Sequence, residues 1–308
     1  MHIGLDIGGY KINGVLTRGN KIIRKRFAPI KSISDKKAII AQIFDCIEYL
    51  IKGINSKEIK GIGIGVPGPV DFKKQKILNP PNVPALRNLF LGKVVEKKFP
   101  ARGWSASGGK IKTKIENDAN CLGLAEALLG AGENKKIVAG LTLGTGVGGF
   151  VVVDKKIFRG KSPRATEFGH KIKIIKNGRK CNCGHRGCLE AYVSARGIVK
   201  TAREKGLLVK NPKQITEMAE RGNKKAKEVF VETGKYLGIA FKNIIRNFKP
   251  EIIIIGGGIS GAGKFIFRPV RKIVKDTKIV KAELGENAGA IGAALLIKFY
   301  PQFIHNRG

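Results

Sequence analysis

Three cysteines lie within eight residues of one another, at Cys181, Cys183 and Cys188. A histidine, His170, precedes the first of them by eleven residues. Three thiolates and one imidazole form the ligand set of a closed structural zinc site, in which the metal braces a loop and takes no part in chemistry. His185 is a competing fourth ligand, and we rank it second because its place in the turn would crowd the thiols. Five cysteines is an odd count, so the pattern favours a metal site over a set of disulfides.

Two carboxylates flank this predicted metal site. Glu167 lies three residues before His170, and Glu190 lies two residues after Cys188. If the metal fixes His170 and Cys188, both carboxylates are held at the rim of one site, where they could accept hydrogen bonds from sugar hydroxyls. In isolation, each would be interpreted as a solvated glutamate.

Asp118 occupies a position suited to proton transfer. It follows a predicted strand at residues 112–115 and precedes a predicted helix at residues 119–129, so we expect it at the edge of a sheet, facing a cleft. A carboxylate within about 3 Å of a hydroxyl group can accept its proton while the oxygen attacks a phosphorus atom. The alternative is that Asn117 or Asp118 only caps the helix.

Three glycine turns follow predicted strands. Such turns bring backbone N–H groups close to phosphate oxygens, because no side chain blocks the approach. Any one of them alone is most often a plain hairpin, but their occurrence together favours nucleotide binding. Asp6, just before the first turn, either holds a hydrated magnesium ion or only supports the turn. The turns are Gly8-Gly9 with Lys11, Gly144-Thr145-Gly146 with Gly148-Gly149, and Gly256-Gly257-Gly258.

The elements that must position these residues form two similar groups. The first group has predicted strands at residues 3–7, 12–16, 22–23 and 59–66, and an amphipathic helix from about residue 35 to residue 51. The second group has a hairpin at residues 137–142 and 149–153, a strand at 252–255, and helices at 189–205, 212–220 and 223–247. Each group starts with a glycine turn between apolar strands, which indicates an internal duplication of one α/β fold.

This organisation predicts two domains in the 308 residues. We place a small N-terminal α/β domain at residues 1–116, with a C-terminal helix at residues 288–308 that packs back on it. A larger α/β domain at residues 117–287 carries the zinc-binding loop.

Bulk composition excludes some classes of protein. Lys and Arg number 59 against 23 Asp and Glu, a net charge of +36 that would attract polyanions such as ATP, polyphosphate or nucleic acid. The basic residues are scattered and no nucleic-acid-binding motif is present, so we expect a general surface bias and no dedicated nucleic-acid site.

No apolar run approaches the roughly 18 to 20 residues that span a bilayer, and no leader precedes the first strand. We therefore expect a cytoplasmic protein with no membrane partner.

The sequence resembles the ROK family of bacterial repressors, open reading frames and kinases, which includes glucokinases, fructokinases and N-acetylhexosamine kinases. The resemblance covers nearly the whole chain, and its motifs are specific in their order and spacing. They lie at residues 6–11, 65–71, 116–120, 143–149, 167–170, 181–190 and 255–258.

This resemblance implies an actin-like ATPase (ribonuclease H-like) fold of two duplicated domains, with ATP, Mg²⁺ and a sugar in the cleft between them. It implies ATP-dependent phosphorylation of a free hexose, with glucose as the first expectation and Asp118 as the catalytic base. The implied sugar contacts are Gly68, Asn117, Asp118, Glu167, His170 and Glu190. The implied ligands of a structural Zn²⁺ are His170, Cys181, Cys183 and Cys188. The implied contacts to ATP are Asp6, Gly8, Gly9, Tyr10, Lys11, Gly144, Thr145, Gly146, Gly256, Gly257 and Gly258.

Three residues depart from the family pattern. Tyr10 stands where the family usually has threonine, so we expect a more crowded or differently oriented first phosphate turn. Pro163 and Thr166 replace small glycines before Glu167, so the family pattern does not predict the shape of the sugar pocket in this chain.

Several alternatives remain beside a glucose kinase. They are a fructose or N-acetylhexosamine kinase, a kinase that uses polyphosphate, and a non-catalytic sugar sensor. Because Met1 leads directly into the first phosphate turn, we expect no DNA-binding helix pair before it and no direct repression. Relatives are commonly dimers or tetramers, so we expect a homo-oligomer.

Overall fold

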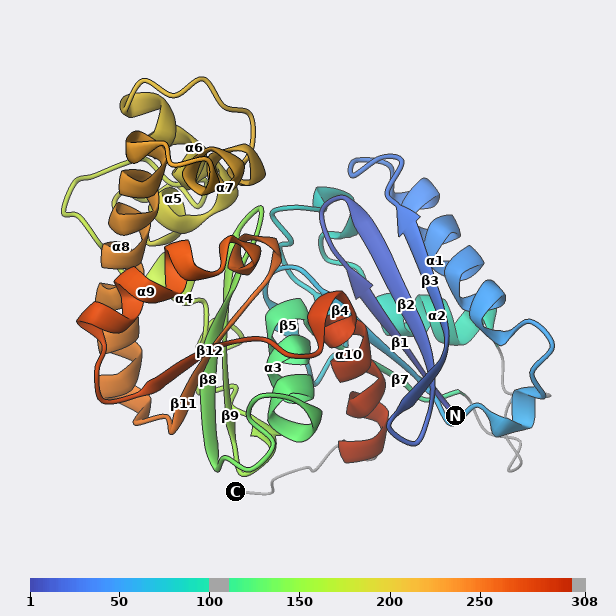
Figure 1. The fold of residues 1–308 in the computed structure, drawn as a ribbon. Coiled ribbons are helices and arrows are strands. Elements are labelled where there is room, and N and C mark those ends of the chain that lie inside the picture. Colours follow the sequence, from blue (N-terminus) through green and yellow to red (C-terminus); the bar gives the residue numbers. More distant parts are fainter. Residues whose placement is uncertain (100–110, 301–308) are drawn as a thin grey trace. The chain divides into compact units, whose positions relative to one another are not determined.

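A computed structural model of the chain describes residues 1–99 and 111–300 (Figure 1). Contacts divide the chain into two compact units. Unit 1 comprises residues 1–129, 161–164 and the chain from Leu284 onward, and unit 2 comprises residues 130–160 and 165–283. The units divide after Leu129, later than the predicted boundary at residue 116, because helix α3 (Asp118–Leu129) packs with unit 1.

Unit 1 is built on a five-stranded sheet in the order β3-β2-β1-β4-β7. Strands β1, β2 and β3 form an antiparallel meander, whereas β4 and β7 join β1 in parallel. The two-residue strands β5 and β6 form a separate hairpin. The strands are β1 (His2–Ile7), β2 (Lys11–Arg18), β3 (Lys21–Pro29), β4 (Ile62–Val66), β5 (Val70–Asp71), β6 (Lys76–Ile77) and β7 (Thr113–Asn117).

Helices cover both faces of this sheet. Helix α1 begins where the Asp35 carboxylate accepts a hydrogen bond from the N–H of Ala38, and its buried residues join the core of the meander. The opposite face carries α3 and the C-terminal helix α10. The helices are α1 (Lys36–Ile51), α2 (Leu91–Lys98), α3 and α10 (Ala288–Phe299), with short 3₁₀ turns η1 (Ser56–Glu58), η2 (Pro84–Leu86) and η4 (Gly285–Asn287).

Glycines let α10 lie directly on the strands. A Cβ atom at Gly4 or Gly63 would overlap the backbone of α10, and one at Gly292 would overlap the backbone of Cys121 in α3. Small residues on both sides therefore allow a close approach of backbone to backbone. Helix α10 ends at Phe299 and packs on strands of the N-terminal sheet, whereas residues 301–308 of the predicted C-terminal helix lie outside the described part.

Unit 2 repeats the sheet of unit 1. Its order is β10-β9-β8-β11-β12, again with two antiparallel pairs followed by two parallel pairs. The predicted duplication is therefore present in the strand topology. The strands are β8 (Ile137–Leu143), β9 (Val147–Val153), β10 (Lys156–Ile157), β11 (Ile252–Gly256) and β12 (Lys278–Lys281).

The helices of unit 2 pack around the long helix α8, whose buried face joins the core of this sheet. Asn211 and Asn223 cap α7 and α8 through their side-chain oxygens. The single helix predicted at residues 189–205 is wrong: Ser194 has an extended backbone and divides it into α5 and α6, capping α6 through the N–H of Gly197. The helices are α4 (Phe168–Lys171), α5 (Glu190–Val193), α6 (Ala195–Glu204), α7 (Pro212–Glu220), α8 (Lys224–Phe248), α9 (Lys264–Ile273) and the 3₁₀ turn η3 (Gly258–Ala262).

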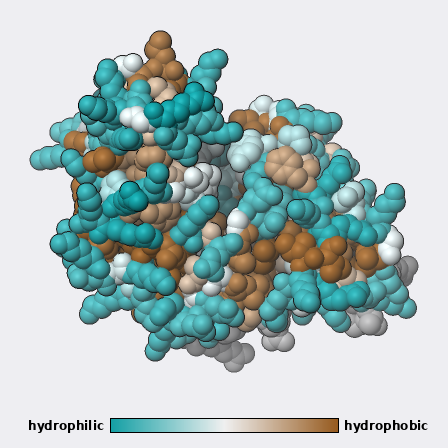
Figure 2. All heavy atoms as spheres, in the orientation of Figure 1, coloured by the Kyte–Doolittle hydropathy of each residue, from teal (hydrophilic) through white to brown (hydrophobic). Residues whose placement is uncertain are grey.

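Polar side chains cover much of the surface that one view of the molecule shows. Figure 2 shows hydrophilic side chains over most of the visible face, consistent with the excess of Lys and Arg in the sequence. Within residues 1–99 and 111–300, no helix combines the length and the apolar character that a bilayer crossing requires.

Candidate functional site

Asp118 lies at the junction of β7 and α3 in unit 1. Its Oδ1 accepts hydrogen bonds from the N–H of Ala119 at 2.8 Å and from Asn117 Nδ2 at 3.1 Å. The true helix cap is Asn117, whose Oδ1 accepts from the N–H of Asn120 at 3.1 Å. The carboxylate of Asp118 therefore stands at a helix N-terminus, close to the partial positive charge of the helix dipole.

The same amide group of Asn117 reaches a second predicted site residue. Asn117 Nδ2 also donates to the carbonyl oxygen of Gly68 at 3.1 Å. Gly68 has a positive φ of 80°, and a Cβ there would meet Asn79 O at 3.0 Å, so glycine is required at this turn. The structure thus brings together three of the predicted sugar contacts, Gly68, Asn117 and Asp118.

Glu116 is a supporting residue that the sequence analysis quoted within a motif but did not assign. It is buried, and its Oε1 accepts from the backbone N–H of Asn117 at 2.9 Å and from Asn120 Nδ2 at 3.0 Å. A glutamate at the end of a buried strand is the signal that marks it, because a carboxylate there needs internal hydrogen-bond donors.

The first glycine turn joins β1 to β2 in unit 1. The N–H of Gly8 donates to the carbonyl of Lys11 at 2.8 Å, which closes the turn. The Tyr10 side chain is 62% exposed, so its ring points largely into solvent and does not crowd the turn. Lys11 Nζ lies 5.8 Å from the centre of that ring.

Asp6 immediately precedes this turn and is half-buried. Burial raises its pKa from 3.8 to about 6, and the nearby charge of Lys11 opposes that rise. A Cβ at Gly289 would lie 2.7 Å from the Asp6 carboxylate, so this side chain packs against the first turn of α10. A charged group held in this way is suited to a cation or to a nucleotide-bound metal.

The other two glycine turns lie side by side in unit 2, because β8 and β11 are neighbouring strands. A Cβ at Gly257, which has a positive φ, would overlap the backbone of Leu143 just before Gly144. In contrast, a Cβ at Gly144 or Gly258 would meet no atom within 4 Å. The backbone at these two positions is therefore open to a ligand.

Gly149 serves packing and not ligand access. It lies within β9, and a Cβ there would overlap the carbonyl of Thr166 and the ring of Phe168. Thr166 itself is buried, so this departure from the family pattern contributes to the interior of unit 2. Pro163 lies in the segment of residues 161–164 that belongs to unit 1.

The predicted metal ligands converge in unit 2. The ligand atoms of His170, Cys181, Cys183 and Cys188 all lie within 4.8 Å of one another. Cys181 Sγ is 3.6 Å from His170 Nδ1, and Cys183 Sγ is 3.6 Å from Cys188 Sγ. A tetrahedral zinc ion with Zn–S bonds of about 2.3 Å holds its ligand atoms about 3.8 Å apart, so the residues present fit such a metal.

Polar contacts and burial act on the thiols of this cluster. Lys173 Nζ donates a hydrogen bond to Cys188 Sγ at 2.8 Å. Burial raises the pKa of the Cys181 thiol to about 12, so a metal that binds this sulfur must displace the proton. Burial also acts to raise the pKa of Cys183, but hydrogen bonds from His185 and the neighbouring thiols outweigh it and lower the value to about 6.

His185 occupies a different position from His170. Its Nδ1 is 3.6 Å from Cys183 Sγ, but it is absent from the group of four converging ligands. The preferred assignment of His170 as the fourth ligand therefore agrees with the geometry.

Glu190 connects the metal cluster to the β8–β9 turn. Its Oε2 accepts a hydrogen bond from the N–H of Val147 at 2.9 Å and lies 3.9 Å from His170 Nε2. The imidazole of His170 thus directs Nδ1 toward the thiols and Nε2 toward Glu190. Glu167 lies one turn before His170, and its carbonyl accepts from the N–H of His170 at 3.0 Å. The predicted contacts Glu167, His170 and Glu190 are therefore neighbours in unit 2.

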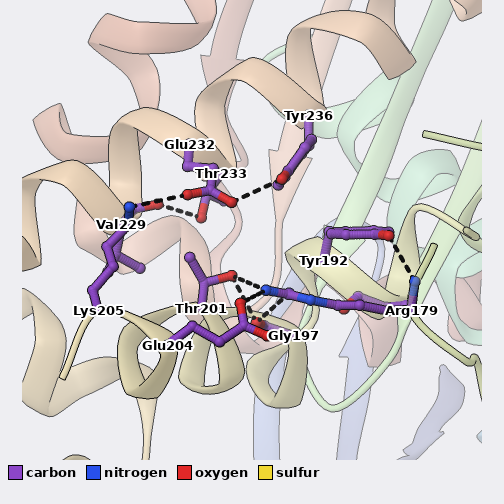
Figure 3. Close-up of polar contacts among 11 residues, drawn as sticks. Arg179, Tyr192, Gly197, Thr201, Glu204, Lys205, Val229, Glu232, Thr233 and Tyr236 are labelled. Atoms are coloured by element: carbon purple, nitrogen blue, oxygen red, sulfur yellow. Dashed lines mark hydrogen bonds and ion pairs between the residues drawn. The ribbon is translucent and has the colours of Figure 1, made fainter. Parts of the chain in front are cut away.

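Arg179 anchors the metal loop and was not singled out from the sequence. Its guanidinium donates to Thr201 Oγ1 at 3.0 Å, to the carbonyl of Gly197 at 3.1 Å and to the carboxylate of Glu204, all on α6 (Figure 3). The guanidinium also lies 4.8 Å from the ring centre of Tyr192, whose hydroxyl accepts from the N–H of Arg179. These contacts fix the start of the cysteine loop. One arginine among 59 basic residues offers no sequence signal of such a role.

Comparison with known proteins supports one family. The sequence model of the ROK family matches residues 2–299. A glucokinase of Thermotoga maritima is 33% identical over 96% of this chain and 96% of its own length. An N-acetyl-D-glucosamine kinase of Photobacterium profundum is 32% identical over 96% of this chain and 99% of its own length.

Solved structures agree with this match. A crystal structure of a ROK family glucokinase from Streptomyces griseus, in complex with glucose and AMPPNP, matches with a TM-score of 0.81 at 29% identity. The match covers 96% of this chain and 98% of that one. The predicted actin-like ATPase fold is therefore confirmed. With its duplicated sheets, its cysteine loop and a family match from residue 2 to residue 299, this chain belongs to the ROK family.

Proposed function

We propose that this chain is an ATP-dependent kinase that phosphorylates a hydroxyl group of a free hexose, with glucose as the preferred substrate. The observation that carries the proposal is the hydrogen-bonded set of Gly68, Asn117 and Asp118 at the end of β7. It holds a carboxylate in a fixed orientation at a helix N-terminus. The likeness to a glucokinase and to an N-acetyl-D-glucosamine kinase supports the class of substrate.

In this proposal Asp118 acts as the general base. It accepts the proton of the sugar hydroxyl while the oxygen forms a bond to the γ-phosphorus of ATP. The bond between that phosphorus and the bridging oxygen breaks, and ADP leaves with the electron pair. Asn117 keeps the carboxylate aimed at the hydroxyl, so that little reorganisation is needed during the reaction.

Residues of unit 2 bind and orient the sugar in the same proposal. Glu167 and Glu190 accept hydrogen bonds from sugar hydroxyls, and His170 contributes Nε2 while its Nδ1 ligates the metal. His170, Cys181, Cys183 and Cys188 would hold Zn²⁺, which would make the loop more rigid. Charged and polar groups that exchange hydrogen bonds with sugar hydroxyls give such sites their selectivity.

The three glycine turns hold the nucleotide in this proposal. Phosphate oxygens accept hydrogen bonds from the backbone N–H groups of two turns. These are Gly8, Gly9 and Lys11, with Tyr10 beside them, in the first turn, and Gly144, Thr145 and Gly146 in the second. The adenosine contacts the third turn, Gly256, Gly257 and Gly258. Mg²⁺ carried by ATP neutralises charge on the phosphates when it is bound. Asp6 would accept a hydrogen bond from water bound to such an ion.

The test is a coupled assay of ADP release with a panel of free hexoses, N-acetylhexosamines and fructose. Turnover with glucose and ATP is expected. The Asp118→Asn variant should lose on the order of a hundredfold or more in kcat, since it keeps the shape of the side chain but not the base. Asp45→Asn, on the exposed side of α1, is the matched control and should keep full turnover.

A second candidate is phosphorylation of an N-acetylhexosamine, favoured by the relative from Photobacterium profundum. A kcat/KM for N-acetylglucosamine above that for glucose would select it. Binding of a sugar without turnover of any member of the panel would instead support a sugar sensor.

A further inference from the structure

Two aromatic side chains and a lysine meet at the first glycine turn of unit 1. Lys11 Nζ lies 5.8 Å from the centre of the Tyr10 ring and 5.7 Å from the centre of the Phe27 ring. At these distances a cation is attracted to the face of an aromatic ring. Tyr10 and Phe27 are 62% and 57% exposed, so neither ring serves the core of the unit. We call these two residues the aromatic pair.

The sheet brings Phe27 to Lys11 although the two residues lie on different strands. Asn13 of β2 pairs with Phe27 of β3, and Lys11 pairs with Pro29. Lys11 and Phe27 are therefore diagonal neighbours on one face of the sheet, a separation that long and aromatic side chains can span.

Hydrogen bonds of the turn place Tyr10 and Lys11 beside the proposed phosphate contacts. The carbonyl of Tyr10 accepts from the N–H of Ile30, just after β3, at 2.9 Å, and the carbonyl of Lys11 accepts from the N–H of Gly8 at 2.8 Å. A Cβ at Gly8 would lie 3.9 Å from Lys11 Cγ, so the stem of the lysine side chain begins beside the backbone of the turn.

Lys11 is a cation without a carboxylate partner at contact distance. None of the ion pairs among residues 1–99 and 111–300 involves it. A ring face, unlike a carboxylate, attracts the ammonium group without neutralising its charge. The lysine therefore keeps its full charge for an anion that binds at the turn.

The departure from the family pattern at Tyr10 fits this arrangement. The threonine that the family usually has there offers no ring, whereas the tyrosine ring stays outside the turn and attracts the lysine. A free lysine side chain loses much rotamer entropy when it binds a ligand, and a side chain that is already held loses less.

We propose that the aromatic pair positions Lys11 to bind a phosphate group of the nucleotide at the first glycine turn. Tyr10 and Phe27 are positioning residues: they contact the lysine, and the lysine contacts the phosphate. This inference rests on the proposed kinase function and adds two residues to its nucleotide site.

The first test is a titration of the full chain with Mg²⁺-ATP and, separately, with adenosine. Tyr10→Leu and Phe27→Leu should each weaken binding of Mg²⁺-ATP about two- to fivefold, which is the effect of one contact between a cation and a ring at an exposed site. The affinity for adenosine, which has no phosphate, should not change. Tyr10→Phe keeps the ring and should bind Mg²⁺-ATP as the parent does.

Phe90→Leu is the matched control. Phe90 is also a partly exposed residue of unit 1, and its ring centre lies 5.3 Å from Lys76 Nζ and 5.2 Å from Lys93 Nζ, so it makes the same kind of contact outside the turn. This variant should keep the parental affinity for Mg²⁺-ATP. Equal weakening by Phe90→Leu and Tyr10→Leu would overturn the inference, because the effect would then follow from the loss of any surface ring.

A double-mutant cycle shows whether the ring acts through the lysine. Lys11→Met keeps the stem and removes the charge, so it should weaken binding of Mg²⁺-ATP about tenfold or more. In the Lys11→Met background, Tyr10→Leu should have no further effect, since no cation is left to hold.

Three results of these titrations would overturn the positioning role. They are additive losses in the double variant, an unchanged affinity of Lys11→Met for Mg²⁺-ATP, and an equal loss of affinity for adenosine and for Mg²⁺-ATP in Tyr10→Leu. The last result would mean that the ring supports the fold of the unit and not the contact to phosphate.

Turnover of a free hexose is then measured separately. In Tyr10→Leu and Phe27→Leu the KM for ATP should rise about two- to fivefold, while the KM for the sugar stays that of the parent. A parental KM for ATP in both variants refutes the positioning role and leaves the kinase intact. The expected loss of Mg²⁺-ATP binding in a protein that phosphorylates no hexose refutes the kinase and leaves the aromatic pair as part of a nucleotide site.

Discussion

Asn117 and Asp118 share the start of one helix but have different tasks. Asn117 Oδ1 accepts the N–H of Asn120 and so provides the cap, while its amide group orients Asp118 and contacts Gly68. The two alternatives drawn from the sequence, capping and catalysis, thus belong to two adjacent residues. For this reason replacement of Asp118 by asparagine tests the base with little change to the helix.

Asp6 illustrates a residue whose charge costs stability. Burial raises its pKa from 3.8 to about 6, so the folded protein holds this proton to a higher pH than the unfolded chain does. The contribution to stability is therefore present below pH 3.8 and is lost as the pH rises through about 6. Above that pH the charged carboxylate destabilises the fold, and a cation bound beside it would offset this cost.

We expect Asp6→Asn to raise the free energy of unfolding at pH 7 by about 1 to 2 kcal/mol and to flatten its pH dependence between pH 4 and pH 6. The same variant should bind Mg²⁺-ATP more weakly, because the amide oxygen that replaces the carboxylate carries no negative charge to attract the hydrated metal. Urea denaturation across pH and nucleotide titration measure the two effects. A variant that is destabilised at pH 7 would show that Asp6 serves the fold.

At the scale of elements, the cysteine loop is the segment whose folding would depend most on metal binding. It has little regular structure, and backbone hydrogen bonds hold its turns, such as those from the N–H of Cys181 to the carbonyl of His185 and from the N–H of Gly187 to the carbonyl of Arg179. The Arg179 contacts to α6 add to this support, and a metal bound by the cysteines would add more.

Cys188→Ser should abolish stoichiometric zinc and lower the melting temperature, because metal binding energy is folding energy for such a loop. Metal analysis of protein purified without chelator, followed by calorimetry, provides the measurement. Cys46→Ser, in α1 of unit 1, removes a buried thiol outside the cluster and should retain the metal. Retention of zinc by Cys188→Ser would remove this cysteine from the ligand set.

Helix α10 packs so closely on strand β4 that no side chain fits at Gly63. A Cβ at Gly63 would overlap the backbone of Ala293, which cannot rotate away as a side chain can. Gly63→Ala should therefore reduce the free energy of unfolding by about 2 to 3 kcal/mol in urea denaturation. Gly261→Ala, where a Cβ would meet no atom within 4 Å, is the control. Equal stability of the two variants would mean that α10 shifts to accommodate the methyl group.

At the scale of the whole molecule, charge is the dominant property. A net charge of +36 repels itself in the folded state, and salt screens that repulsion. The melting temperature should rise as the salt concentration increases from about 0.01 M to about 0.15 M, over which the screening length falls from about 30 Å to about 8 Å. Calorimetry at fixed pH measures this. A melting temperature that falls over this range would show that attractive ion pairs outweigh the repulsion.

Much of the fold could be predicted because its signals are local. Apolar runs with glycine turns marked both meanders, and the spacing of Cys181, Cys183 and Cys188 marked the metal loop. The interruption at Ser194 was missed, since its cause is a side-chain cap within an otherwise periodic segment. Helix α9, which contains Pro269, and the four-residue edge strand β12 were also missed, because neither has a strong pattern of its own.

The candidate site was predictable as a set of residue types but not as a set of contacts. The contact of Asn117 with Gly68 joins residues 49 positions apart, and the packing of Gly149 against Thr166 joins two different segments of unit 2. The hydrogen bonds of Asn117 to Asp118 and Asn120 are local, but the sequence did not show which of Asn117 and Asp118 caps α3. Arg179 had no visible signal at all, because its partners on α6 are brought to it by the fold.

The position of α10 also has a consequence for biosynthesis. Unit 2 is almost continuous in the chain, from residue 130 to residue 283, whereas the sheet of unit 1 receives α10 only after that whole stretch has been made. Because synthesis proceeds from the N-terminus, the glycine-containing face of β1 and β4 stays without α10 until unit 2 has been synthesised. Helix α10 is thus translated after unit 2, although it completes the sheet of unit 1, which is translated before unit 2.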